Sequence, residues 1–279
     1  MINEADRLGE ISPDCRLFFM EKGGMRPMTQ GRIHSLESMG LVDGPGIRSV
    51  VFLQGCALCC LYCHNPDTWA ADGPAETVTP RQLTDRLLRY RPYYGDRGGV
   101  TFSGGEPLLQ QEFLAECLAL CQEAGLHTCL DTAGCGLGEY GAILAHTDLI
   151  LLDVKHYTPE GWRKVTGSSM EPFSRFLAAA QQAAVPLWVR HVVAPGLTDG
   201  DAHLTGLEEY LKTIRYIERV ELLPYHTLGV HKYAALGLPY PLEGVPPMDG
   251  AALEQWNERL NRSCASGNGT EEKESEHEH

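Results

Sequence analysis

The chain has 279 residues, of which 43% are hydrophobic and 22% are charged, as expected of a globular protein with one large α/β domain or two small ones. Its formal net charge of −14 argues against nucleic acid or an anionic membrane surface as the main partner. No stretch approaches 18 uninterrupted apolar residues, so we expect no membrane-spanning helix. Ten cysteines without an export signal favour the reducing cytoplasm.

The two ends of the chain differ in composition from its centre. Residues 1–28 carry scattered charges and little periodicity, which predicts a weakly ordered extension. Residues 263–279 end in a run rich in glutamate, which predicts a disordered acidic tail. We therefore expect the folded domain to span residues 29–262.

Short apolar strands alternate with longer helical patterns between these ends. After a short edge strand at residues 32–37, strands are expected at 49–53, 99–102, 128–131, 149–154, 187–193 and 220–224. A helix begins after Thr79, a suitable N-cap followed by Pro80, and others are expected near 108–123, 172–184, 202–216 and 250–262. The alternation predicts a parallel sheet with right-handed crossovers.

Unusual polar residues distinguish between an open sheet and a curved barrel. They lie in or just after successive strands: the cysteines of residues 56–63, then the turn at 104–106, Asp131, Asp153 with Lys155, Arg190 and His226. Barrel enzymes keep their active sites at the carboxyl ends of the strands, and six strands reach one site only if the sheet curves round it. We therefore expect an α/β fold of the incomplete (β/α)6 type, a partial TIM barrel.

The loop after the first of these six strands carries three thiols in a C-x3-C-x2-C spacing, Cys56, Cys60 and Cys63, with Tyr62 before the last. Thiolates this close can bind one centre, and thiolates hold iron–sulfur clusters. A [4Fe–4S] cluster has four irons, so three cysteines leave one iron open for another ligand. Cys59 also creates two overlapping C-x2-C pairs, but zinc sites usually separate such pairs by a dozen or more residues. A disulfide is not expected, because the sequence shows no export signal and lacks the composition of a small, loop-rich protein.

Two further groups could contact a ligand. Gly104 and Gly105 lack side chains, so the backbone can approach a ligand closely there, although an ordinary strand-to-helix turn is the alternative. Asp153 and Lys155 point the same way from a strand, which suits a ligand that carries both an amine and a carboxylate. Pairing of Lys155 with Asp153 or with Asp131 is the structural alternative.

Arg190 and His226 are weak signals when taken singly. An interior arginine is often part of a structural ion pair, and a single histidine is often a core residue. Their placement on the same side as the cysteine loop makes them candidates for the site. No role follows from the sequence for four other cysteines, Cys15, Cys59, Cys129 and Cys135.

The cysteine spacing, followed after roughly forty residues by the Gly-Gly-Glu turn, resembles the radical S-adenosylmethionine (SAM) enzymes. Longer stretches resemble one branch of that family, the pyruvate formate-lyase activating enzymes, over about residues 30–262. These stretches occur in the family's order at residues 42–48, 60–65, 101–106, 127–132, 151–155, 188–190 and 221–226. The partial barrel is also the fold that the resemblance implies.

The resemblance assigns roles to individual residues. It implies that a [4Fe–4S] cluster is held by Cys56, Cys60 and Cys63, with the open iron chelating the amino and carboxylate groups of SAM. It implies SAM contacts from Tyr62, Cys63, His64, Gly104, Gly105, Glu106, Asp131, Asp153, Val154, Lys155 and His226. It further implies a monovalent cation held by Asp131, Thr132 and Asp153. Lys155 and Arg190 are the candidate catalytic residues, with Arg190 placed to hold a backbone carbonyl or carboxylate of the substrate.

The resemblance also implies an activity and its partners. The reduced cluster passes an electron into SAM, which yields methionine and a 5′-deoxyadenosyl radical, and this radical takes hydrogen from a glycine of pyruvate formate-lyase. Flavodoxin or ferredoxin is the expected electron donor, and we expect a cytoplasmic monomer with one cluster. Activation of another glycyl-radical enzyme, or action on a small molecule, is the alternative. Departures from the family pattern are Cys59, Ala133 and the two terminal segments.

Overall fold

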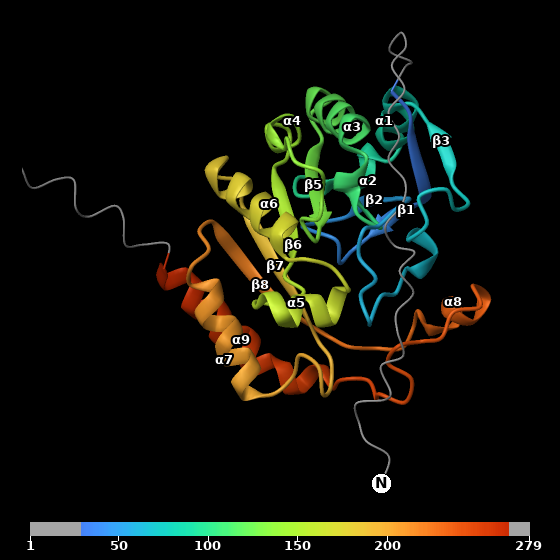
Figure 1. Ribbon diagram of the computed structural model, residues 1–279. Coiled ribbons are helices and arrows are strands. Elements are labelled where there is room, and N and C mark those ends of the chain that lie inside the picture. Colours follow the sequence, from blue (N-terminus) through green and yellow to red (C-terminus); the bar gives the residue numbers. More distant parts are fainter. Residues whose placement is uncertain (1–28, 268–279) are drawn as a thin grey trace, which may run out of the picture.

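The computed structural model describes residues 29–267, which form one eight-stranded sheet covered by helices (Figure 1). The strand order is β3-β1-β2-β4-β5-β6-β7-β8. The strands are β1 (Gly31–Gly40), β2 (Arg48–Leu53), β3 (Glu76–Val78), β4 (Gly99–Gly104), β5 (His127–Thr132), β6 (Leu149–Asp153), β7 (Leu187–Val193) and β8 (Ile217–Pro224). From β2 to β8 all pairs in this order are parallel, which confirms the six expected strands. The first expected strand is not an edge, because β3 pairs antiparallel outside β1.

Helices connect the parallel strands. They are α1 (Pro80–Leu88), α2 (Arg91–Tyr94), α3 (Gln111–Glu123), α4 (Gly141–Leu144), α5 (Pro159–Thr166), α6 (Glu171–Gln182), α7 (Asp201–Leu211), α8 (Val230–Ala235) and α9 (Glu254–Gly267), with 3-10 turns η3 (Pro66–Thr68), η4 (Pro107–Leu109) and η5 (Gly250–Leu253). The start of α1 is fixed by a capping box in which Thr79 and Gln82 each bind the other's backbone N–H. Within residues 29–267, no helix is long and apolar enough to cross a membrane.

The two faces of the sheet differ in their surroundings. Along β7, Val189, His191 and Val193 are buried, whereas the alternate residues Trp188 and Arg190 are only partly buried. Because side chains alternate between the faces of a strand, one face packs against helices and the other faces a more open interior. In Figure 1, α3, α4 and α6 lie along one side of the sheet, while α8 lies at the lower right, in contact with η3. This one-sided covering agrees with the expected partial barrel, whose interior accepts ligands.

Helix α9 covers the edge strand β8. The side chain of Asn257 accepts a hydrogen bond from the N–H of Leu222 at 2.7 Å. Asn261 accepts from the N–H of Val220 at 2.9 Å and donates to the carbonyl of Val220 at 2.8 Å. These amides occupy backbone groups that an edge strand otherwise leaves unpaired. Helix α9 continues to Gly267, past the expected domain end at residue 262, and the predicted 1–28 extension lies outside the described residues.

Candidate active site

The cysteine loop is anchored on both sides by the fold. It leaves β2 and passes between η3 and the end of α5. The N–H of Cys56 donates to the carbonyl of Trp69 at 3.1 Å, and the N–H of Cys59 donates to the carbonyl of Thr166 at 3.0 Å. These bonds connect the loop to segments far apart in the sequence, so the thiols are positioned before any cofactor binds.

The thiols of Cys56, Cys60 and Cys63 form one electrostatic group. Burial raises the pKa of each thiol, that of Cys60 to about 12, and for Cys56 and Cys60 the negative charge of neighbouring thiolates acts in the same direction. Backbone N–H groups of Leu58 and Asn65 point at the sulfurs of Cys56 and Cys63, at 3.5 and 3.4 Å. Such amides stabilise thiolates, the form that binds metal.

This group of thiols fits a [4Fe–4S] cluster better than a single metal ion. Among the described residues, no three His, Cys, Asp or Glu side chains lie close enough together to chelate one ion. In a cubane each thiolate binds a different iron, so its sulfurs stand farther apart than the ligands of one ion. The C-x3-C-x2-C spacing and the electrostatic interaction of the thiols therefore fit three ligands of one cluster.

The Gly-Gly-Glu turn packs directly against the start of the cysteine loop. A Cβ on Gly104 would lie 2.1 Å from the backbone nitrogen of Leu53, and one on Gly105 would lie 2.1 Å from the carbonyl oxygen of Gly55. Both positions therefore require glycine because the chain ends of β2 and β4 meet there. A close approach of this backbone to a ligand, the reason expected from the sequence, stays a prediction.

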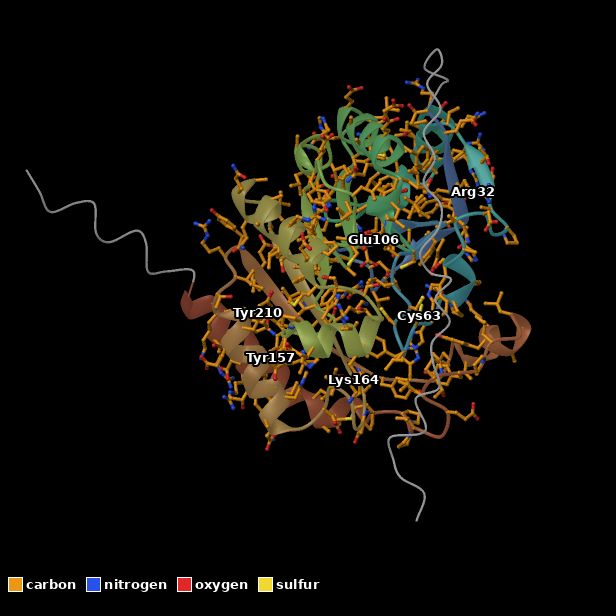
Figure 2. All side chains as sticks on the ribbon, in the orientation of Figure 1. Arg32, Cys63, Glu106, Tyr157, Lys164 and Tyr210 are labelled. Atoms are coloured by element: carbon orange, nitrogen blue, oxygen red, sulfur yellow. The ribbon has the colours of Figure 1, made fainter. Side chains whose placement is uncertain are left out.

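Glu106 is buried and holds the chain that follows β5. Its carboxylate accepts hydrogen bonds from the hydroxyl of Thr132 at 2.5 Å and from the N–H groups of Ala133 and Cys135 at 3.1 and 3.3 Å. Burial raises its pKa to about 6, against the effect of these donors. Figure 2 shows Glu106 near the centre of the molecule, and Cys63 toward the side that carries α8.

A charged cluster lies on the inner face at the ends of β5, β6 and β7. Arg190 donates through Nη2 to Oδ1 of Asp131 and through Nε to Oδ1 of Asp153, the latter at 3.3 Å. Lys155 Nζ lies 2.8 Å from Oδ2 of Asp153, and Ser103 donates to Oδ2 of Asp131 at 2.6 Å. Of the two internal pairs that the sequence left as alternatives, Lys155 forms the one with Asp153, and Asp131 pairs with Arg190.

These ion pairs keep the cluster charged despite its burial. Burial alone would raise the pKa of Asp153, but Lys155 and Arg190 together lower it. Burial opposes the charge of Lys155 and Arg190 too, yet the neighbouring carboxylates raise the pKa of both. Lys155 also lowers the pKa of the Cys60 thiol, so the charged cluster and the cysteine loop share one electrostatic environment.

Aromatic side chains form another wall of the site. The rings of His64 and His226 stack with centroids 4.0 Å apart, and His64 Nε2 donates to the carbonyl of His226 at 2.9 Å. The hydroxyl of Tyr62 is buried and has no hydrogen-bond partner in residues 29–267. Lys155 Nζ lies 5.9 Å from the centre of the Tyr62 ring. The structure thus brings His226 to the cysteine loop, beside Tyr62 and His64, which the resemblance also gives as SAM contacts.

Val154, for which the resemblance implies a contact with SAM, is buried in the structure. Its side chain is fully buried, its N–H donates to the carbonyl of Arg190 at 2.9 Å, and its own carbonyl accepts from His191 at 2.6 Å. A contact between Val154 and SAM therefore remains a prediction that these bonds do not favour.

Asp43 is a site residue that the sequence reasoning did not single out. Burial raises its pKa to about 6, Asp131 raises it further and Arg190 lowers it, so Asp43 lies near the charged cluster. The carbonyl of Asp43 accepts from the hydroxyl of Thr101 at 2.7 Å, which holds the loop between β1 and β2 against the inner face. Asp43 begins an Asp-Gly-Pro-Gly turn, whose composition predicts a connection between strands and gives no signal of a buried carboxylate.

Comparison with known proteins identifies the family. A sequence model described as the radical SAM superfamily matches residues 50–205. The chain is 55% identical over 224 residues to the pyruvate formate-lyase-activating enzyme of Clostridium pasteurianum, covering 80% of this chain and 93% of that one. The chain belongs to the pyruvate formate-lyase-activating enzymes. The activating enzyme of Staphylococcus epidermidis is 44% identical over 236 residues, covering 82% of this chain and 94% of that one.

Membership among these activating enzymes confirms the resemblance drawn from the motifs. As a radical SAM enzyme, the chain uses a [4Fe–4S] cluster and SAM. A solved structure of SuiB from Streptococcus suis bound to the precursor peptide SuiA is similar in fold. Its TM-score is 0.57 at 14% identity, covering 78% of this chain and 46% of that one. That likeness supports the partial-barrel architecture alone.

Proposed function

We propose that this chain activates pyruvate formate-lyase by generating a radical on a backbone glycine of the lyase. The proposal rests on two groups of side chains that lie close together. One is the three thiols of the cysteine loop, and the other is the ion pair of Asp153 and Lys155, whose Lys155 acts on the Cys60 thiol. The first group fits the cluster, and the second offers a carboxylate and an ammonium to a zwitterionic ligand such as SAM. Membership in the activating enzymes supplies the substrate.

The cofactors perform the chemistry and the protein positions them. When bound, the reduced cluster supplies the electron that cleaves SAM to methionine and the 5′-deoxyadenosyl radical, which abstracts hydrogen from the glycine. The hydrogen bonds of Cys56 and Cys59 hold the thiol loop in place while SAM binds. Burial of Tyr62 and Glu106 excludes water from the same region, which protects a reactive radical.

The SAM contacts expected from the sequence fit this arrangement in part. His64, His226 and Tyr62 offer stacking surfaces for adenine, and Tyr62 has a buried hydroxyl that a ligand would satisfy. Lys155 and Asp153 offer charges to the carboxylate and amine of SAM. Glu106 already accepts several hydrogen bonds from the protein, so its role is to hold the Gly104–Gly105 turn in position.

We also propose a monovalent cation between Asp131 and Asp153, on the neighbouring strands β5 and β6. The two carboxylates lie close enough to share Arg190, and buried carboxylates need positive charge. Arg190 and Lys155 supply that charge in the structure. A cation held there with Thr132 would take over part of this role and free part of the Arg190 guanidinium for a carbonyl or carboxylate of the substrate.

The chemistry also bears on the electron donor and on the cellular compartment. We propose flavodoxin or ferredoxin as the electron donor, because a single low-potential electron is needed for each turnover. We propose a monomer in the cytoplasm, where a reducing environment preserves the cluster. The net charge of −14 is unfavourable for nucleic acid and for anionic membranes as partners.

Anaerobic electron paramagnetic resonance (EPR) tests the proposed function. Reconstituted enzyme, SAM, a reductant and pyruvate formate-lyase are mixed, and a doublet from a glycyl radical is expected. The doublet should disappear when the lyase glycine is changed to alanine. SAM cleavage coupled to a small molecule, with no radical on the lyase, would show that the activity belongs to a different branch of the family.

A further inference from the structure

Trp69 is fixed to both ends of the cysteine loop. Its backbone carbonyl accepts the N–H of Cys56 at 3.1 Å. Its indole meets Tyr233 edge to face, with ring centroids 5.8 Å apart and an angle of 86° between the planes. Tyr233 in turn donates its hydroxyl to the carbonyl of Cys63 at 3.0 Å. The indole is thereby positioned beside the last cysteine of the loop.

The indole N–H of Trp69 is buried and lacks a hydrogen-bond partner within the described part of the chain. Indole is a donor only, and buried donors in folded proteins are nearly always satisfied. Trp69 contacts Tyr233, and Tyr233 binds the carbonyl of Cys63, so the Cys63 thiol is the acceptor on offer beside this N–H. No formed hydrogen bond joins the indole N–H to another group in residues 29–267.

The missing acceptor fits the metal-bound form of Cys63. A thiol is a weak acceptor, whereas a thiolate carries negative charge and accepts more strongly. The N–H of Asn65 already points at the same sulfur at 3.4 Å. Hydrogen bonds to cluster sulfurs are among the factors that set the reduction potential of an iron–sulfur cluster.

We propose that the indole N–H of Trp69 donates a hydrogen bond to Sγ of Cys63 in the cluster-loaded protein and raises the reduction potential of the cluster. This inference rests on the proposed role of Cys63 as a cluster ligand. The hydrogen bond stabilises negative charge on the sulfur, so it favours the reduced cluster, which carries one more electron. Trp69 is a positioning residue that acts through Cys63.

The test is the reduction potential of the reconstituted cluster in Trp69→Phe, which keeps an aromatic ring and removes the N–H. We expect the cluster of this variant to be about tenfold harder to reduce, a shift of about 59 mV to more negative potential for a one-electron couple. Trp162→Phe is the matched control, because Trp162 is also a buried tryptophan whose N–H has no partner among the described residues. Its potential should equal that of the unchanged protein.

A second measurement does not depend on how the variant folds. The unchanged chain is labelled with ¹⁵N at the indole nitrogen, and pulsed EPR of the reduced cluster is recorded. A ¹⁵N coupling that persists in labelled Trp162→Phe is expected. Equal potentials in Trp69→Phe and Trp162→Phe, or no ¹⁵N coupling, would overturn the inference while leaving the cluster assignment intact. Failure of the unchanged chain to assemble a cluster would instead overturn the proposed function.

Discussion

At the scale of single residues, Glu106 shows how a motif residue can serve the site indirectly. Its carboxylate accepts from the Thr132 hydroxyl and from two backbone amides after β5, so it joins the ends of two neighbouring strands. The sequence could place Glu106 at a strand end. It could not orient the carboxylate, because that depends on which amides of the chain near Ala133 turn toward it.

The first residue-scale prediction concerns which thiols bind iron. Cys59→Ser should keep a cluster with about four irons per chain, as one cubane requires, while Cys60→Ser should lose it. The reason is the C-x3-C-x2-C spacing of Cys56, Cys60 and Cys63, whose thiols interact with one another. Iron analysis and visible absorbance after anaerobic reconstitution measure this. Cluster loss in Cys59→Ser with an intact cluster in Cys60→Ser would reverse the ligand assignment.

A second residue-scale prediction concerns the cation. Potassium or sodium should strengthen SAM binding, and Asp153→Ala should weaken it on the order of tenfold, the scale of a lost supporting ligand. The variant should also lose the salt dependence, because Asp153 is one of the two carboxylates proposed to hold the ion. Equilibrium binding in matched salts is the measurement. Asp85→Asn, which changes only an exposed pair with Arg81, is the control. Equal SAM affinity in all salts and in Asp153→Ala would contradict the site.

At the scale of elements, the periodicity of apolar residues was sufficient to predict the long helices and strands and insufficient to predict the short ones. The strand expected at residues 187–193 is β7 (Leu187–Val193), because a seven-residue run with three valines and a tryptophan is typical of a strand. Strand β3 (Glu76–Val78) and helix α5 (Pro159–Thr166) were not predicted. Three residues are too few to show a period, and α5 is recognised mainly by its Thr158 cap. Yet the end of α5 binds the cysteine loop, so a functional support was missed.

The element-scale prediction concerns helix α9, whose Asn261 binds the backbone of the edge strand β8. Asn261→Ala should reduce the free energy of unfolding by about 1–3 kcal/mol, because it leaves buried backbone groups of Val220 without partners. Glu258→Ala, on the exposed side of α9, should change it by less than about 0.5 kcal/mol, since its pair with Arg262 is exposed. Chemical denaturation of the two variants measures the difference. Equal losses would mean that α9 does not satisfy the edge of β8.

At the scale of the whole molecule, strand order brings distant residues to one site. Asp131, Asp153 and Arg190 come from β5, β6 and β7, which are neighbours in the sheet. The sequence predicted this meeting because consecutive parallel strands usually pair in order. It did not predict that Arg190 would bridge both carboxylates, since side-chain reach across the inner face depends on the curvature of the sheet.

The same packing places His191 of β7, which is buried, against His203 of α7, which is partly buried. His191 Nδ1 donates to the carbonyl of Val154 at 2.6 Å, and its Nε2 lies 3.0 Å from Nε2 of His203. Burial lowers the pKa of His191 to about 3 and that of His203 to about 4, from an ordinary 6.5. The folded protein thus binds fewer protons here than the unfolded chain between pH 6.5 and these values. Stability is full above pH 6.5 and is lost as the pH falls toward 3.

This protonation difference gives a prediction for the stability of the whole protein. Asp43 and Glu106, whose pKa values are raised to about 6, contribute with the opposite sign, so a variant is needed to isolate the histidines. His203→Gln keeps a hydrogen-bond donor for His191 and removes one proton site. Between pH 6.5 and 4, the free energy of unfolding should fall less steeply for His203→Gln than for the unchanged chain. The expected difference in slope is up to about 1.4 kcal/mol per pH unit, the value for one proton. Denaturant titrations of cluster-free protein under reducing conditions measure both slopes, and parallel curves would contradict the prediction.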